Sequence, residues 1–186
     1  MNSPLLLKNP EVLKPGDTIG IVAPSAGLAA LFPHRVEQGV VALEQMGYKV
    51  IFAPHARERD GYVSAPAKER ASDLHLMFEN PFVRAILCMT GGHHANQVLK
   101  YLDYALIAAN PKILVGYSDI TLLHWALARK AGLRTFYGPS LIAEFGEYPE
   151  MHSYTRKYFD RAVTALDPIG AVTPSPTWTD EFLDWG

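Results

Sequence analysis

The sequence has a single cysteine, a modest share of charged residues and no long apolar run. Cys88 is the only cysteine among 186 residues, so no disulfide can form within the chain, and a reducing compartment is expected. No stretch approaches the roughly 18 uninterrupted apolar residues that a transmembrane helix requires. The N-terminal residues also lack the charged region and apolar core of a secretory signal. We therefore expect a cytoplasmic protein with no membrane partner and with Cys88 inside a buried strand.

Charge and ligand-binding motifs are equally sparse. Charged residues make up 19% of the chain and the formal net charge is −2. The sequence therefore lacks the excess of positive charge that binding to a nucleic acid requires. A small-molecule or short-peptide substrate is the better expectation. No full Gly-x-Gly-x-x-Gly motif or phosphate-binding lysine motif is present. His93 and His94 are adjacent, but no partner stands at zinc-like spacing, so neither a cofactor nor a metal is expected.

What the sequence does contain is a regular alternation of apolar runs and amphipathic segments. Apolar runs without polar alternation, each followed closely by Gly or Pro, predict strands buried on both faces. The predicted strands are residues 18–23, 49–53, 83–89, 112–115 and 134–137, and helical spacing is kept over residues 33–46, 67–79, 96–102, 104–109, 120–128 and 154–166. This alternation predicts an α/β fold with a doubly wound, mostly parallel five-stranded sheet and helices on both faces, of the flavodoxin-like type.

The strongest functional signal lies in residues 110–128. A short apolar strand is followed at once by Gly116-Tyr117-Ser118-Asp119 and then by a helical pattern. A side chain on such a tight strand-to-helix turn projects above the carboxyl edge of the sheet. Ser118 is therefore a candidate nucleophile, and the N–H of Asp119 is a candidate oxyanion donor. The alternative is that Ser118 merely caps the helix, because the full Gly-x-Ser-x-Gly motif is not present.

Other turns with small residues fall at the same edge of the sheet. Ser25 follows the first predicted strand, and Gly91 and Gly92 follow the third. In doubly wound sheets, ligands lie beyond the carboxyl ends of the strands. A Gly-Gly pair there offers bare backbone N–H groups to a ligand oxygen, although a turn that needs positive φ would explain the pair without a ligand. Gly91, His93 and Ser25 are therefore candidate substrate-binding residues.

Five blocks of the chain carry a family resemblance. They are LKPGDTIGIVAPS at residues 13–25, ERASDLHLMF at 69–78, MTGGHHANQVLKYLDYALIAANPKILVGYSDIT at 89–121, GLRTFYGP at 132–139 and PTWTDEFLDW at 176–185. With these blocks the sequence resembles the N-terminal domain of the LD-carboxypeptidase family of serine peptidases, and most closely its microcin C immunity branch. The resemblance implies a two-domain hydrolase whose first domain is similar to that of class I glutamine amidotransferases.

The resemblance also implies roles for single residues. In a Ser-His-Glu triad, Ser118 would be the nucleophile, with the backbone N–H groups of Gly92 and Asp119 as oxyanion donors. The Glu and His would come from a C-terminal domain. The expected function is hydrolysis of an LD-peptide or aminoacyl-nucleotide amide through Ser118 once that domain is supplied, and His124 is expected to face away from the site. The alternatives are a catalytically inactive, truncated or paralogous binding module and, with no motif in its support, a flavodoxin-like phosphate binder.

The resemblance also divides the chain into three expected parts. Residues 1–12 would form an N-terminal extension, residues 13–168 the nucleophile-bearing α/β domain, and residues 169–186 a linker toward a C-terminal domain absent from this chain. The last part contains four large apolar side chains among prolines and acids: Trp178, Phe182, Leu183 and Trp185. Apolar side chains without a covering element mark interaction surfaces. A homodimer, or another association through this segment, is therefore expected.

Overall fold

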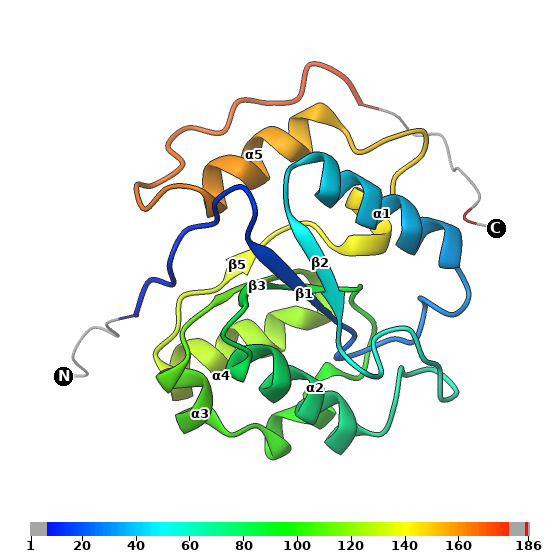
Figure 1. Ribbon diagram of the computed structural model, residues 1–186, viewed down its shortest axis with the longest axis vertical. Coiled ribbons are helices and arrows are strands. Elements are labelled where there is room, and N and C mark those ends of the chain that lie inside the picture. The colour runs from blue at the N-terminus through cyan, green and yellow to red at the C-terminus, as the bar shows by residue number, and fades with distance from the viewer. Residues whose placement is uncertain (1–6, 179–184, 186) are drawn as a thin grey trace.

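A sheet of five parallel strands forms the middle of the protein (Figure 1). The computed structural model describes residues 7–178 and Trp185. The strands are β1 (Thr18–Val22), β2 (Lys49–Phe52), β3 (Val83–Cys88), β4 (Ile113–Gly116) and β5 (Phe136–Tyr137). Their order is β2-β1-β3-β4-β5 and all neighbours are parallel, which is the flavodoxin-like arrangement. The predicted fold is confirmed.

The helices lie on both faces of this sheet, as predicted. Helices α1 (Pro33–Gln45) and α5 (Ser153–Val163) cover one face (Figure 1). Helices α2 (Ala67–Glu79), α3 (Tyr104–Ala109) and α4 (Thr121–Ala131) cover the other. Because both sides of the central strands are buried in this arrangement, their sequences are apolar runs without alternation.

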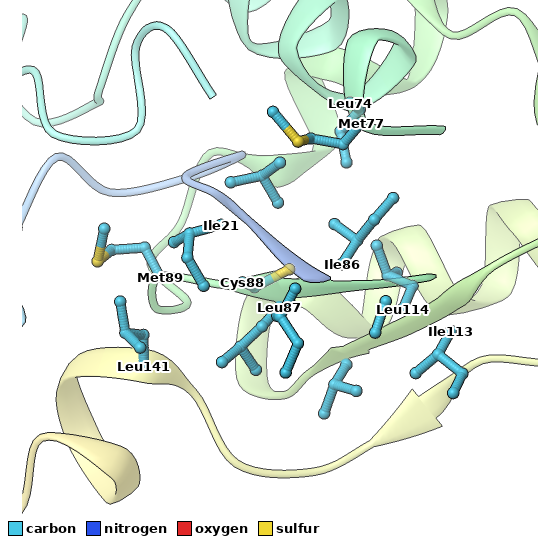
Figure 2. Close-up of a cluster of buried hydrophobic side chains, with 14 of the residues drawn as sticks. Ile21, Leu74, Met77, Ile86, Leu87, Cys88, Met89, Ile113, Leu114 and Leu141 are labelled. Carbon is cyan, nitrogen blue, oxygen red and sulfur yellow. The ribbon is translucent and has the colours of Figure 1, made fainter. Parts of the chain in front are cut away.

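The apolar core fills the space between the sheet and the helices (Figure 2). Ile21 of β1, Leu87 of β3 and Leu114 of β4 are at most 1% exposed, and burying one such side chain contributes about 1.5–3 kcal/mol. Cys88 is fully buried in β3, as predicted. Burial raises the pKa of its thiol, so the sulfur stays protonated and unreactive near neutral pH.

Strand β5 is shorter than predicted, and the residues just before it pair with a different segment of the chain. The prediction covered residues 134–137, whereas the strand contains only Phe136 and Tyr137. Before it, Lys8 forms an isolated parallel bridge with Leu133. The N–H of Lys8 donates to Gly132 O at 2.7 Å, and Lys8 O accepts from the N–H of Arg134 at 3.0 Å. The start of the predicted strand therefore pairs with the N-terminal segment at the edge of the sheet.

Two helical segments differ from the sequence prediction. Residues 96–102 were predicted as an α-helix, but the structure has a 3-10 helix, η1 (Ala95–Tyr101). Such tight turns are common in short connections, and this one joins the end of β3 to α3. The π-helical turn η3 (Leu141–Phe145) follows β5 and was not predicted.

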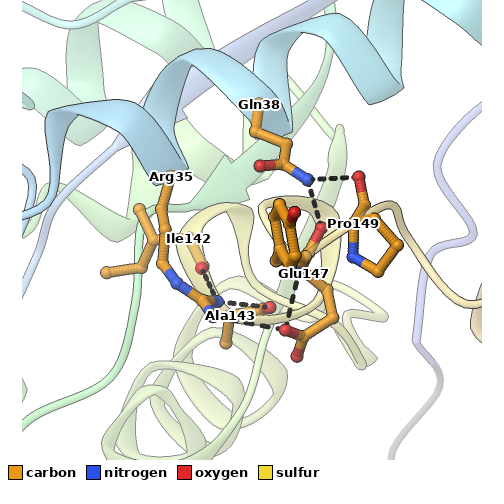
Figure 3. Close-up of polar contacts among 7 residues, drawn as sticks. Arg35, Gln38, Ile142, Ala143, Glu147 and Pro149 are labelled. Atoms are coloured by element: carbon orange, nitrogen blue, oxygen red, sulfur yellow. Dashed lines mark hydrogen bonds and ion pairs between the residues drawn. The ribbon is translucent and has the colours of Figure 1, made fainter. Parts of the chain in front are cut away.

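Helix α1 holds η3 and the residues after it in place (Figure 3). The buried guanidinium of Arg35 donates from Nη1 to Ile142 O at 3.1 Å and pairs through Nη2 with Glu147 at 3.2 Å. The Gln38 amide donates to the backbone oxygens of Glu147 and Pro149. These contacts fix the turn η3 although it lies about 100 residues further along the chain.

The tryptophans of the C-terminal segment have different surroundings. Trp178 is 86% exposed. Trp185 is partly buried, because its ring lies 5.4 Å from that of Phe32 and the Arg35 guanidinium lies 4.3 Å from its centre. Phe182 and Leu183 lie outside the described residues. No helix in the described part of the chain is long and apolar enough to cross a membrane.

Candidate active site

Ser118 sits at the point where β4 leads into α4. Residues 116–119, here called the nucleophile turn, end β4 and open a short 3-10 turn, η2 (Ser118–Ile120). Among the described residues, Ser118 is the only non-glycine with a positive φ, at 60°, and such a conformation costs about 1–3 kcal/mol. Its side chain is exposed, and neither η2 nor α4 has a side-chain cap. The strained turn therefore presents a free hydroxyl and does not serve as a helix cap.

The turn after β3 packs directly against this serine. It comprises residues 91–94 and is called the glycine turn. A β-carbon placed on Gly91 would lie 3.0 Å from Ser118 Cβ and 3.2 Å from its Oγ. Gly92 has φ of +143°, and a β-carbon there would lie 2.5 Å from Ser25 Oγ. A side chain at Gly91 would therefore crowd Ser118, and Gly92 is required by its backbone conformation.

Several backbone N–H groups at this junction have no acceptor within the described parts of the chain. They include those of Gly92 in the glycine turn and of Asp119, which follows the candidate nucleophile, as well as those of Gly91, His93 and Ser118. Further along the glycine turn and at the start of η1, the N–H groups of His94 and Ala95 both donate to the carboxylate of Asp119 at 2.8 Å. The two groups that are predicted as oxyanion donors are therefore available to a ligand oxygen, unlike those of His94 and Ala95.

Ser25 is buried and hydrogen-bonded within the protein. Its side chain is fully buried. The hydroxyl donates to Asp119 Oδ2 at 2.5 Å and accepts from the His94 N–H at 3.1 Å. The sequence predicts that Ser25 binds substrate, but the structure places its hydroxyl beneath the glycine turn. His93 is exposed in that turn, and Gly91 is buried against the nucleophile turn.

The residue before the nucleophile is held from the β5 side. The Tyr117 hydroxyl donates to Glu144 Oε1 at 2.9 Å. The other carboxylate oxygen of Glu144 accepts the N–H and the hydroxyl of Ser140 at 2.8 and 3.2 Å. Burial and the nearby Glu144 charge raise the pKa of Tyr117 to about 12, so its phenol remains a neutral donor.

None of the described histidines is hydrogen-bonded to the Ser118 hydroxyl. His124 Nε2 lies 2.8 Å from Gly116 O and must donate to it, so Nδ1 is the acceptor for the Thr135 hydroxyl at 2.9 Å. Burial lowers the pKa of His124. This imidazole is therefore neutral and has both nitrogens occupied. It was expected to face away from the site, but it binds Gly116 of the nucleophile turn and has no free nitrogen for the Ser118 hydroxyl. In the part of the chain that the structure describes, no cluster of three metal-ligating side chains is present.

Two polar groups of this site were not predicted from the sequence. The first is the carboxylate of Asp119, for which only the backbone N–H was considered. The second is Arg70 of α2, which is 1% exposed and reaches the glycine turn. Its place on the apolar face of α2, in line with Leu74 and Met77, is a signal that could have found it, because a charged residue on a buried helix face requires polar partners.

The sequence matches curated relatives over most of its length. It is 42% identical over 174 residues to the putative carboxypeptidase YocD of Bacillus subtilis (strain 168), which covers 92% of this chain and 53% of that protein. It is 38% identical over 171 residues to the microcin C7 self-immunity protein MccF of Escherichia coli, which covers 91% of this chain and 50% of that protein. The chain thus spans about half the length of these relatives.

Solved structures have the same fold. The microcin C7 self-immunity protein MccF in its wild-type apo state matches with a TM-score of 0.88 at 36% identity, over 95% of this chain and 53% of that one. An MccF-like protein from Bacillus anthracis str. Ames matches with a TM-score of 0.81 at 40% identity, over 85% of this chain and 47% of that one.

The family pattern described as the LD-carboxypeptidase N-terminal domain matches residues 19–138. This range includes all of β1 except Thr18, the other four strands, the glycine turn and the nucleophile turn. The chain therefore belongs to the LD-carboxypeptidase family and corresponds to its N-terminal domain.

Proposed function

We propose that this chain is the nucleophile-bearing part of a serine carboxypeptidase or amidase, in which Ser118 attacks the carbonyl carbon of an amide. The observation that carries the proposal is the exposed serine at φ 60°, with Gly91 packed against it. A polar side chain held in a strained conformation at the carboxyl edge of a sheet is typical of a nucleophile. Membership of a peptidase family supports the same assignment.

In the proposed reaction, attack by Ser118 Oγ breaks the carbonyl π-bond and places a negative charge on the substrate oxygen. The N–H groups of Gly92 and Asp119 receive this oxyanion. One such donor contributes about 10²- to 10³-fold to kcat in serine peptidases. Collapse of the tetrahedral intermediate expels the amine, which takes up the proton that the base removed from Ser118. An acyl group is left on Ser118, and water then hydrolyses it.

A serine hydroxyl needs a base to accept its proton, because it is a weak nucleophile at its ordinary pKa. No described histidine is placed to do this for Ser118. We therefore propose that a Glu and a His from a C-terminal domain complete the site, as the family resemblance implies. On its own, the chain then retains only the contributions of binding and the oxyanion donors.

The names of relatives suggest two substrate classes. One relative is a probable murein peptide carboxypeptidase of B. subtilis and another is a murein tetrapeptide carboxypeptidase of Pseudomonas aeruginosa. MccF has been solved with adenosine monophosphate and with aspartyl sulfamoyl adenosine. For this chain we propose an amide in an LD-linked peptide or in an aminoacyl nucleotide.

The test is a fusion of this chain to the second half of B. subtilis YocD, assayed with both substrate classes. Ser118→Ala should lower turnover by at least about 10³-fold. Ser153→Ala, which removes another exposed serine hydroxyl, should have no effect.

Two outcomes would contradict the proposal. If the isolated chain turned over either substrate at an ordinary rate and lost it on Ser118→Ala, the base would lie within this sequence, and His93 and His94 would be the first residues to replace. If the fusion bound a substrate but hydrolysed neither, the chain would be a binding module.

A further inference from the structure

The glycine turn is held on two sides by charged side chains that belong to other elements. Asp119 comes from the nucleophile turn and Arg70 from α2. The two side chains engage opposite ends of the same residue, because the N–H of His94 donates to Asp119 and the C=O of His94 accepts from Arg70. The orientation of the turn relative to Ser118 is thereby fixed at its final residue.

The Arg70 guanidinium donates hydrogen bonds to three chain segments: the loop after β1, the loop before α2, and the glycine turn with the start of η1. Its Nη1 donates to Pro24 O at 2.6 Å and to His94 O at 3.1 Å, and its Nε donates to Ala65 O at 2.7 Å. Nη2 donates to the Gln97 side chain at 2.6 Å. Burial lowers the pKa of Arg70, and the negative charge of Asp119 acts in the opposite direction. The planar fork of an arginine can reach several acceptors in this way, whereas a lysine cannot.

One oxygen of the Asp119 carboxylate accepts three hydrogen bonds. Oδ2 accepts the Ser25 hydroxyl and the N–H groups of His94 and Ala95 at 2.5, 2.8 and 2.8 Å. It therefore links the end of β1, the glycine turn and the start of η1. Asp119 also supplies the backbone N–H next to Ser118, so its side chain connects the residue of one proposed oxyanion donor to the turn that contains the other.

We propose that Arg70 and the carboxylate of Asp119 are positioning residues, which hold the glycine turn so that the Gly92 N–H faces the oxygen of a substrate bound at Ser118. The catalytic consequence rests on the function proposed above. The positioning of the glycine turn by these two side chains does not depend on that function, because the hydrogen bonds exist within the chain itself. Charge is important here, because a hydrogen bond to an ionised group is roughly twice as strong as one between neutral groups.

The variant that tests this is Asp119→Asn, which keeps the shape and the backbone N–H but removes the charge. Asp103→Asn is its matched control, because Asp103 likewise accepts two backbone N–H groups at a helix start, those of Ala105 and Leu106. Ser25→Ala removes one donor to the same oxygen, and Ser64→Ala is its control, a buried serine whose hydroxyl binds Ala23 O.

The first measurement is amide hydrogen exchange on the chain alone, which requires no activity. Asp119→Asn should speed exchange of the His94 and Ala95 amides on the order of tenfold and shift the Gly92 amide resonance. Asp103→Asn should change the Ala105 and Leu106 amides and leave Gly92 unchanged. An unchanged glycine turn in Asp119→Asn would overturn the proposal, whether or not the fusion hydrolyses a substrate.

The second measurement is steady-state kinetics on the fusion to the YocD half. Asp119→Asn should lower kcat by about 10- to 100-fold, less than the loss of a whole oxyanion donor, with KM within about threefold. Ser25→Ala should show a smaller fall in kcat, and both controls should retain wild-type values. Activity that depends on Ser118 but has a wild-type kcat in Asp119→Asn would also overturn the proposal. A fusion with no activity would contradict the proposed function only, and the exchange data would still decide the positioning role.

Discussion

The contact between Gly91 and Ser118 allows a direct test of the site by one added methyl group. Gly91 does not have a positive φ, so alanine is compatible with its backbone. The cost of Gly91→Ala is therefore steric. The new β-carbon would stand 3.0 Å from Ser118 Cβ, 3.2 Å from its Oγ and 3.3 Å from Tyr117 O.

The expected size of the effect follows from these distances. Non-bonded carbon atoms prefer a separation of about 3.5–4.0 Å, so the nucleophile turn or the glycine turn must move by a few tenths of an ångström. Displacements of about 1 Å at a reacting group cost up to about 10²-fold in rate. Because this movement is smaller, we expect kcat of the fusion to fall by about threefold to tenfold. Overpacking of this kind destabilises by about 1–3 kcal/mol, and each kcal/mol lowers Tm by about 2–4 °C at this chain length.

The assay is steady-state hydrolysis by the fusion, together with thermal unfolding of the chain. Gly138→Ala is the matched control, because Gly138 lies at the same edge of the sheet and its β-carbon would meet only Val115 Cγ1 at 3.2 Å. It should leave kcat near the wild-type value. If Gly91→Ala left kcat unchanged, the contact with Ser118 would have no catalytic importance and the reasoning would fail.

Three further predictions concern pH dependence and association. His55 donates to Asp73 at 2.9 Å, and this hydrogen bond raises the pKa of His55. The contribution of the bond to the free energy of unfolding is therefore present below pH 6.5 and is lost as pH rises through the pKa of His55 in the folded protein. In urea unfolding, His55→Ala should therefore cost about 1 kcal/mol at pH 6 and less at pH 9, and equal costs would contradict this. Burial lowers the pKa of His124, so the contribution of neutral His124 to the free energy of unfolding is present above pH 6.5 and is lost as pH falls. His124→Gln should therefore lower the free energy of unfolding by about 1–2 kcal/mol at pH 7.5 and make it less dependent on pH in the acid range. Trp178 is 86% exposed, and we expect it to contribute to self-association. In sedimentation experiments, Trp178→Ser should weaken self-association about fivefold or more. If the wild-type chain sediments as a monomer, Trp178 does not have this role.

The fold and the nucleophile turn could be predicted because their signals are local. Apolar runs that end in Gly or Pro identify the strands, and the pattern around Ser118 lies within a few residues of it. The parallel order then brings the glycine turn and the nucleophile turn to the same edge, because β3 and β4 are neighbours. The pairing of Lys8 with Leu133, just before β5, was not predictable in this way, since the two residues lie far apart in the sequence.

The hydrogen bonds of the site depend on distant pairs and could not be predicted from local pattern. Ser25 and Asp119 are 94 residues apart, and Arg70 binds Pro24 across 46 residues. A buried serine at a strand end is compatible with a ligand contact or with a structural hydrogen bond, and only the fold distinguishes these. The same holds for Glu144, which reaches Tyr117 from a π-helical turn that no sequence periodicity indicates.

The most direct test of the central claim is to trap the covalent intermediate. The fusion to the YocD half would be mixed with a slowly released ester analogue of its substrate, quenched in acid, digested and analysed by mass spectrometry. The account predicts an acyl group on the peptide that contains Ser118 and none in Ser118→Ala. An acyl group on any other residue, or turnover that persists in Ser118→Ala, would contradict it.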